Sequence, residues 1–167
     1  RGNMKNKSIK QSAKPDLKAG FNEVLAAYQR QDFQTALEKA RGLLTFYPQQ
    51  DAVLNMAGVI LAQTNREEEA VAMWQKIPEA KKSHSVLNNL GNACRRLKKW
   101  DLAEQYLRKA LKLKPDHTEA HWNLVLTLND AGRNVEGLQA VKAFLALKPN
   151  DANGLEYAAM LAFNAQN

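Results

Sequence analysis

The sequence predicts an all-α solenoid in which antiparallel helix pairs stack one after another. The first observation is a series of small residues that lie 34, 33 and 34 positions apart: Ala36, Ala70, Ala103 and Gly137. The second is a proline 12 positions after three of them: Pro48, Pro115 and Pro149. The third is the helical spacing of the apolar residues between these markers. A period near 34 residues with two apolar helical stretches is typical of a helical solenoid.

Helix ranges follow from the apolar spacing and from the residues that stop helices. The predicted helices cover these ranges: 17–30 and 33–47, 51–64 and 66–77, 84–97 and 100–113, 118–131 and 134–147, and 152–165. In the first pair, Pro48 lies just beyond the second helix. In the second pair, Glu67 to Glu69 favour a helix N-terminus through the macrodipole, as a solvated first turn. Pro78 ends that pair early, so we expect an irregular connection over residues 78–83.

The third pair has the clearest pattern. Gly91 and Ala103 are small, which indicates that two helices cross closely there. Apolar residues at helical spacing flank them: Leu87, Leu90, Cys94, Leu97, Leu107 and Leu111. Pro115 lies just past the second helix and cannot continue it. Phe33 and Trp100 hold matching places early in the second helices of the first and third pairs, and we interpret both as packing residues.

The fourth pair follows the same order, and the sequences KPD at 114–116 and KPND at 148–151 supply turn residues before the next helix. In the terminal helix we expect these residues to cover the preceding pair: Leu155, Ala158, Ala159 and Ala162. Leu161 and Phe163 would then lack a cover. We therefore expect either that the natural chain continues beyond residue 167 or that this helix associates with a second copy.

The repeated positions resemble the consensus of the tetratricopeptide repeat (TPR) family, W-x2-L-G-x2-Y followed by A-x3-F and P. The best match is in the third pair: Leu87, Leu90, Gly91, Cys94, Ala103, Leu107 and Pro115. The second pair matches except at the proline: Leu54, Ala57, Gly58, Leu61, Ala70 and Trp74. The fourth matches more loosely: His121, Leu124, Val125, Leu128, Gly137, Val141 and Pro149. The first departs from the pattern at Gly20 and Glu23.

This resemblance covers about residues 17–167 and implies a right-handed superhelix of four repeats plus a C-terminal helix. The expected boundaries are as follows: repeats at about 17–50, 51–83, 84–117 and 118–151, and a terminal helix at 152–165. Residues 1–16 are expected to form a basic, disordered tail, whose first four residues resemble an expression remnant.

Charge and composition limit the classes of partner. The net charge is +7, of which residues 1–16 contribute +4, so the repeats themselves are nearly neutral and do not favour nucleic-acid binding. No apolar run approaches the roughly 18 residues of a membrane span. The single cysteine, Cys94, allows no intrachain disulfide, and no signal-peptide stretch is present. We expect a cytoplasmic protein, unless a leader has been removed.

In the TPR family the first helices of successive repeats line a concave groove. By the resemblance, the candidate groove residues here are Asn22, Tyr28, Asn55, Asn88, Asn89, Asn92, Arg95, Arg96, Trp122, Asn123, Leu126 and Asn129. Further apolar positions on the same face are Phe21, Leu25, Met56, Val59, Tyr157 and Met160. Asparagine is a mediocre helix former, so its recurrence in all four repeats needs a reason other than helix stability.

Two explanations of the asparagines remain open. An amide offers both a donor and an acceptor, which matches the backbone of an extended peptide. The arrangement is similar to the asparagine ladder of O-GlcNAc transferases at Asn22, Asn89 and Asn123, whereas Asn55 lies one position out of register. Alternatively, the asparagines belong to the repeat consensus and their amides bond across the interface within a hairpin. Arg95 and Arg96 either favour an acidic ligand or form a solvated helix end.

Two other family functions are not supported. The carboxylate clamp that captures chaperone C-termini needs basic residues where this chain has Ser85, Asn89, Glu119 or Asn123. His117 and His121 are four residues apart, but His117 falls in a predicted turn, so we predict no metal site. Cys94 is expected to be a buried, inert thiol. No phosphate loop or activated nucleophile is apparent, so we predict neither catalysis nor a cofactor.

The sequence therefore predicts a non-catalytic scaffold whose concave groove binds an extended peptide or a partner helix. The alternative is the accessory, substrate-recruiting TPR region of a larger enzyme, such as a glycosyltransferase or sulfotransferase. The expected partner is a protein or peptide, with possible self-association through the C-terminal helix.

Overall fold

The structure is a computed structural model that describes residues 13–166, and these residues form α-helices, one 3-10 helix and no strand. The helices are α1 (Leu17–Gln29), α2 (Phe33–Phe46), α3 (Asp51–Gln63), α4 (Glu67–Gln75), α5 (His84–Arg96), α6 (Trp100–Leu113), α7 (Thr118–Asp130), α8 (Asn134–Leu147) and α9 (Ala152–Asn164), with the 3-10 helix η1 (Glu79–Lys81). Each predicted helix is found within two residues of its predicted bounds. Of the predicted N-terminal tail, residues 1–12 lie outside the described part.

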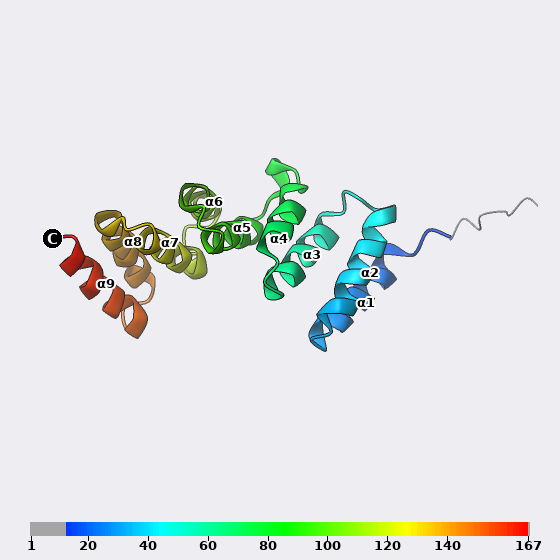
Figure 1. The fold of residues 1–167 in the computed structure, drawn as a ribbon, viewed down its shortest axis with the longest axis horizontal. Helices are drawn as coiled ribbons and strands as arrows, with labels where there is room; N and C mark the ends of the chain where they lie inside the picture. Colours follow the sequence, from blue (N-terminus) through cyan, green and yellow to red (C-terminus); the bar gives the residue numbers. More distant parts are fainter. Residues whose placement is uncertain (1–12, 167) are drawn as a thin grey trace, which may run out of the picture.

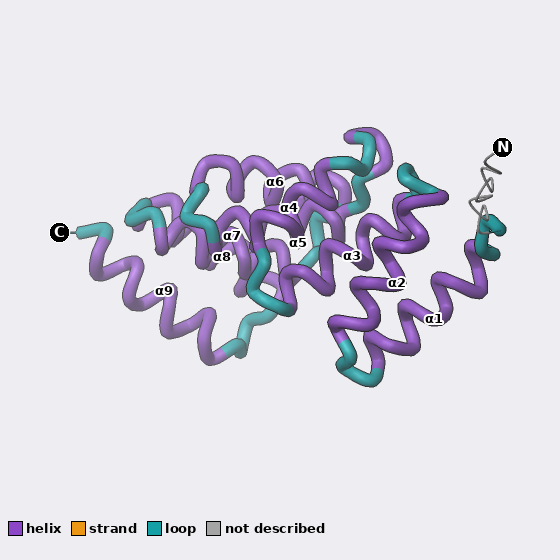
Figure 2. Tube along the Cα trace, turned by 45° about the vertical axis from the view of Figure 1, so that its right-hand side comes forward, coloured by secondary structure: helices purple, strands orange, loops and turns teal. Residues whose placement is uncertain are grey.

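The helices follow one another along the long axis of the molecule in chain order (Figure 1). Each helix contacts the next one in the chain, and the first helices of neighbouring pairs also contact each other, α3 with α5 and α5 with α7. In Figure 2, α1 and α9 lie at the two ends of the array, while α4 and α6 lie along its upper edge. This arrangement confirms the all-α solenoid that the sequence predicts.

The turn inside each helix pair has the same backbone geometry. One residue in each turn has a positive φ: Gln31 (60°), Asn65 (57°), Lys98 (59°) and Gly132 (72°). The residue after it donates its backbone N–H to a helix carbonyl four residues before the left-handed one, as Lys99 does to Cys94 at 2.9 Å. These bonds satisfy carbonyls that the helix end leaves without a partner. The repeat is therefore visible in the turns as well as in the core.

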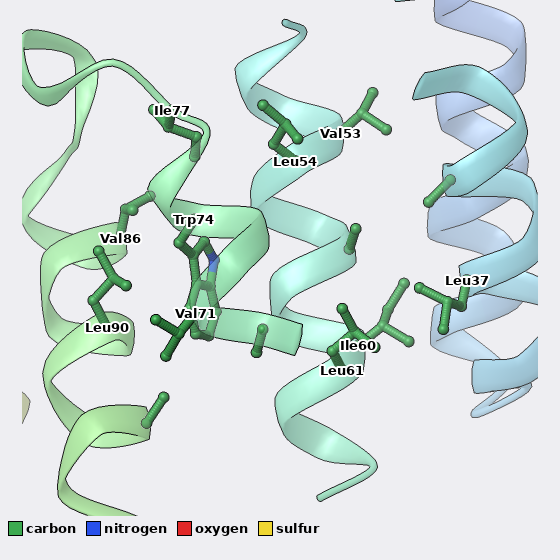
Figure 3. Close-up of a cluster of buried hydrophobic side chains, with 14 of the residues drawn as sticks. Leu37, Val53, Leu54, Ile60, Leu61, Val71, Trp74, Ile77, Val86 and Leu90 are labelled. Atoms are coloured by element: carbon green, nitrogen blue, oxygen red, sulfur yellow. The ribbon is translucent and has the colours of Figure 1, made fainter. Parts of the chain in front are cut away.

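Small residues let the two helices of a pair approach closely. A Cβ atom added to Gly91 of α5 would lie 2.5 Å from Leu107 Cγ of α6, and one added to Gly58 of α3 would lie 2.5 Å from the Trp74 ring of α4. Figure 3 shows Val71 and Trp74 of α4 beside Leu90 of α5. The prediction that helices cross at Gly91 is confirmed.

The connection after α4 is irregular, as Pro78 predicts, but it is well anchored. Lys82 is buried, and its Nζ donates to the Ile77 carbonyl (2.7 Å) and to Glu79 Oε2 (2.9 Å). The other carboxylate oxygen of Glu79 accepts from Lys109 Nζ of α6 at 2.7 Å. A lysine therefore holds this connection where other repeats have a proline.

The predicted packing face of α9 is wrong at Leu155 and Leu161, whereas Ala158 packs on the preceding core and Phe163 is exposed, as predicted. Leu161, which we expected to lack a cover, is fully buried, and Leu155, which we expected to provide one, is 51% exposed. Leu161 lies on one helical face with Ala158 and the buried Gly154. It fits against Gly137 of α8, where an added Cβ would lie 3.3 Å from the Leu161 methyl carbons. The small residue at 137 thus sets the register of the terminal helix.

Candidate peptide-binding groove

The first helices form a surface with two neighbouring hollows. The central hollow has a volume of about 200 Å³ and lies between α3, α4, α5 and the first turn of α7. Its lining includes Val59, Ala62, Glu67, Asn89, Asn92, Arg96 and Glu119. The second, the Trp122 hollow, has a volume of about 380 Å³ and is lined by α7, α8 and the start of α9. Glu119 lines both, so the hollows adjoin on the same side of the array.

Asn89 and Asn92 line the central hollow, as expected for groove residues. They are half-buried and lie three positions apart on α5, so they share a helix face with Arg96. Asn92 Oδ1 accepts a hydrogen bond from Arg95 Nη2 at 3.3 Å. Within residues 13–166, no hydrogen bond uses the Asn89 side chain. Asn89 therefore has both its donor and its acceptor available to a ligand.

Three other candidate asparagines are used inside the protein. Asn88 and Asn123 are buried, and Asn123 Nδ2 donates to Asn88 Oδ1 at 2.9 Å, which joins α7 to α5. Asn55 Oδ1 accepts from Trp74 Nε1 at 3.0 Å, which joins α3 to α4. Asn55 thus bonds across its own hairpin, as the alternative explanation expects, whereas the Asn88–Asn123 bond joins two neighbouring hairpins.

Arg95 and Arg96 form ion pairs at the end of α5, where Arg95 is partly buried and Arg96 is exposed. Arg95 Nη1 lies 2.8 Å from Asp130 Oδ2 of α7. Arg96 Nη2 lies 2.9 Å from Glu67 Oε1 and 2.8 Å from Asn65 Oδ1. Both positive charges are therefore largely compensated within the protein, which weakens their attraction for an acidic ligand.

Glu67 was not predicted as a groove residue, and the expectation that it forms a solvated turn is wrong. Its side chain is 10% exposed, and it lines the central hollow at the start of α4. The Glu67 Oε1 atom is close to Arg96 but accepts no hydrogen bond among the described residues. Its ion-pair partner, Arg96, lies on α5, and local sequence carries no signal of that pairing. Glu119, likewise unpredicted, lines both hollows from the first turn of α7.

The remaining candidates are spread along the same face. Trp122 lines its hollow, with its ring 5.0 Å from that of Phe144 and 5.1 Å from that of Tyr157. Leu126 and Asn129 are half-buried on α7, at the repeat positions equivalent to Asn92 and Arg95. On α1, Asn22 is exposed, and Tyr28 is half-buried with its ring 5.6 Å from that of Phe33. Neither α1 residue lines the two hollows.

Burial shifts the pKa values of Cys94 and His117, two residues that the sequence analysis considered. Cys94 is buried, as expected, and burial raises the pKa of its thiol, which disfavours the reactive thiolate. Burial lowers the pKa of His117, whose ring lies 4.9 Å from that of His84. No group of three or more potential metal ligands occurs within residues 13–166. None of the helices in that range combines the length and apolar character that a bilayer-spanning segment requires.

Two models of the family described as tetratricopeptide repeat match the chain, one over residues 21–84 and the other over residues 84–117. Together these ranges span more than half of its 167 residues. The chain belongs to the tetratricopeptide repeat (TPR) family. No curated protein matches the sequence.

Solved structures of TPR proteins share the fold. The crystal structure of a MamA protein superposes with a TM-score of 0.85 at 16% identity, covering 89% of this chain and 82% of MamA. A MamA fragment from Desulfovibrio magneticus RS-1 gives 0.83 at 17% identity, covering 89% and 85%. YrrB, described as a TPR protein with an unusual peptide-binding site, gives 0.81 at 22% identity, covering 91% and 79%. At these identities the likeness concerns the fold.

Proposed function

We propose that this chain is a non-catalytic protein-interaction scaffold that binds an extended peptide or a partner helix along the face of its first helices. The observation that carries the proposal is the central hollow, where the Asn89 amide is half-buried and uses no hydrogen bond within the described residues. A helix interior gains nothing from such a residue. A ligand that bonds to it would gain about 0.5–1.5 kcal/mol for each hydrogen bond.

The geometry of the groove supports a ligand in extended form. Asn89, Leu126 and Asn129 come from successive first helices, so a chain that crosses α5 and α7 can meet them in turn. Amides accept and donate without regard to ligand sequence, while the ring of Trp122 adds an apolar contact area in the second hollow. Repeat arrays of this kind generally use such extended concave surfaces for binding. The described peptide-binding site of YrrB is a parallel within the same fold.

The test is peptide selection followed by affinity measurement. A library of random linear peptides is panned on the protein, and binders are measured by fluorescence anisotropy against wild type and an Asn89→Ala/Asn129→Ala variant. These two side chains form no hydrogen bonds within residues 13–166, so their removal leaves the fold intact. We expect the variant to bind about tenfold more weakly, because two hydrogen bonds are lost.

The matched control is Gln105→Ala, which removes an exposed amide from α6, a second helix. It should bind as wild type does, and circular dichroism should show all three proteins equally helical. The absence of any peptide whose affinity depends on Asn89 and Asn129 would refute the proposed function. Substitution of Asn123 or Trp122 is a poorer test, because each has partners inside the protein.

A further inference from the structure

Arg95 and Arg96, the two arginines near the central hollow, both form ion pairs. One carboxylate that lines this hollow forms none within residues 13–166. Arg95 pairs with Asp130 and Arg96 with Glu67. Glu119 forms no ion pair within the described part of the chain, and it lines both hollows. The only other charged residues in the central hollow are Glu67 and Arg96, which offset each other. The central hollow therefore carries a net negative charge in a chain whose net charge is +7.

The hydrogen-bond acceptors of the hollow point to the same kind of ligand. Glu67 Oε1 lies 2.9 Å from Arg96 Nη2 in an ion pair but accepts no hydrogen bond from the described residues, although its side chain is nine-tenths buried. The side-chain oxygen of Asn89 is also available, and that of Asn92 has a second lone pair beside its long bond to Arg95. A partly buried acceptor without a hydrogen bond costs free energy, so a donor brought by a ligand is favoured here.

The size and walls of the hollow fit one long side chain. Its volume of about 200 Å³ is below the roughly 300–1,000 Å³ of pockets that hold whole small molecules. Val59, Ala62 and Ala93 give it apolar walls. A lysine or arginine can lay its methylene stem along such walls and keep its charged end near polar groups.

We propose that the central hollow binds the side chain of a lysine or arginine in the partner peptide. Lysine brings three donors and no acceptor, and the hollow offers carboxylate and amide oxygens. Glu119 supplies the uncompensated charge, and Asn89 and Asn92 supply neutral acceptors. An acidic side chain at the same place would meet Glu67 and Glu119 and would be repelled. This inference rests on the proposed function, since it names the peptide class that the groove prefers.

The test uses the peptides selected above. We expect them to share a lysine or arginine at one fixed position, and replacement of that residue by norleucine, which keeps the stem and removes the charge, should weaken binding about tenfold. Glu119→Gln should weaken binding of the basic peptide by a similar factor and leave the norleucine peptide unchanged. The matched control is Glu68→Gln, which removes an exposed carboxylate outside both hollows.

The possible results separate this inference from the proposed function. Peptides whose affinity depends on Asn89 and Asn129 but which carry no fixed basic residue would overturn the inference and leave the proposed function standing. Equal losses for the basic and norleucine peptides with Glu119→Gln would also overturn it. A selection that yields no peptide dependent on the groove would overturn both.

Discussion

At the scale of single residues, side-chain size decides how closely the paired helices approach, and partnered amides decide how the first helices join. Gly58 and Gly91 sit where a neighbouring side chain leaves no room for a Cβ atom. Asn88 and Asn123 bury a single hydrogen bond between α5 and α7. The first role could be predicted from the repeat spacing. The second could not, because the sequence alone does not distinguish an amide in the groove from one at a helix interface.

Replacing Gly91 by alanine should destabilise the protein by about 1–3 kcal/mol, because the added methyl group would overlap the buried Leu107 side chain. Gly58→Ala should act similarly through Trp74. Urea unfolding followed by circular dichroism measures the free energy of unfolding. Gly42→Ala is the control: no atom lies within 4 Å of its added Cβ, so alanine should stabilise α2 by about 0.5–1 kcal/mol. Equal effects at positions 42 and 91 would contradict this account of close helix approach.

Replacing Asn123 by alanine should cost about 1–3 kcal/mol, because the buried Asn88 oxygen would lose its partner. The Asn88→Ala/Asn123→Ala variant should cost less than the sum of the two single substitutions, since the second removes a group that is already unpaired. A double-mutant cycle in urea measures this coupling. Additive costs would show that the two amides do not depend on each other.

At the scale of elements, the helices were predicted correctly because their markers, apolar spacing and prolines, are local. In the structure the side chains of Asp16, Ser83 and Asp151 cap the starts of α1, α5 and α9. The packing of Leu155 and Leu161 on α9 was predicted wrongly. The side of α9 that faces α8 depends on the contact of Leu161 with Gly137, which is distant in the sequence. The anchoring of the 78–83 connection was also missed, since the Glu79–Lys109 pair joins residues 30 positions apart.

Leu161→Ala should destabilise the C-terminal part of the array by about 2–5 kcal/mol, because Leu161 is fully buried between α9 and α8. Hydrogen exchange should show lost protection in α9 and α8 before the N-terminal helices, because repeat arrays depend mainly on neighbouring contacts. Leu155→Ala is the control, and its effect should stay within about 0.5 kcal/mol since that side chain is half exposed. A larger loss of stability for Leu155→Ala than for Leu161→Ala would support the packing face that the sequence predicted for α9.

The Glu79 anchor should make stability depend on pH. Hydrogen bonds from Lys109 and then Lys82 lower the pKa of Glu79 from 4.5 to about 2. Because the folded-state pKa is the lower one, this contribution is fully present above about pH 4.5 and is lost as the pH falls towards 2. The side chain is 60% exposed, so the contribution is at most about 1 kcal/mol.

The Glu79→Gln variant should therefore be less stable than wild type at pH 6, and the difference should shrink as the pH falls through this range. Thermal unfolding at a series of pH values measures it. Glu68→Gln, which removes an exposed carboxylate without an ion pair in the described residues, serves as the control. A difference between wild type and Glu79→Gln that is constant with pH would show that the lysine contacts do not lower the pKa of Glu79.

At the scale of the whole molecule, the repeat period made the solenoid predictable, because stacking of similar units leaves few other arrangements. The sequence predicted which helix face forms the groove, but not which side chains on that face are available to a ligand. Which of the groove residues are available depends on contacts between helices, such as Asn55 with Trp74 within one repeat and Arg96 with Glu67 between two repeats. Of the predicted asparagines, Asn89 keeps its amide available in a hollow, and the uncompensated charge there belongs to Glu119.

The most direct measurement for the account as a whole is an NMR titration of isotope-labelled protein with a selected peptide. Bound peptide should shift the side-chain amide resonances of Asn89 and Asn129 and the backbone resonances of α3, α5 and α7, while the Gln105 side chain on α6 should not respond. Shifts confined to α2 and α6, which line neither hollow, would mean that partners dock elsewhere on the array, and the proposed groove would then have no binding role.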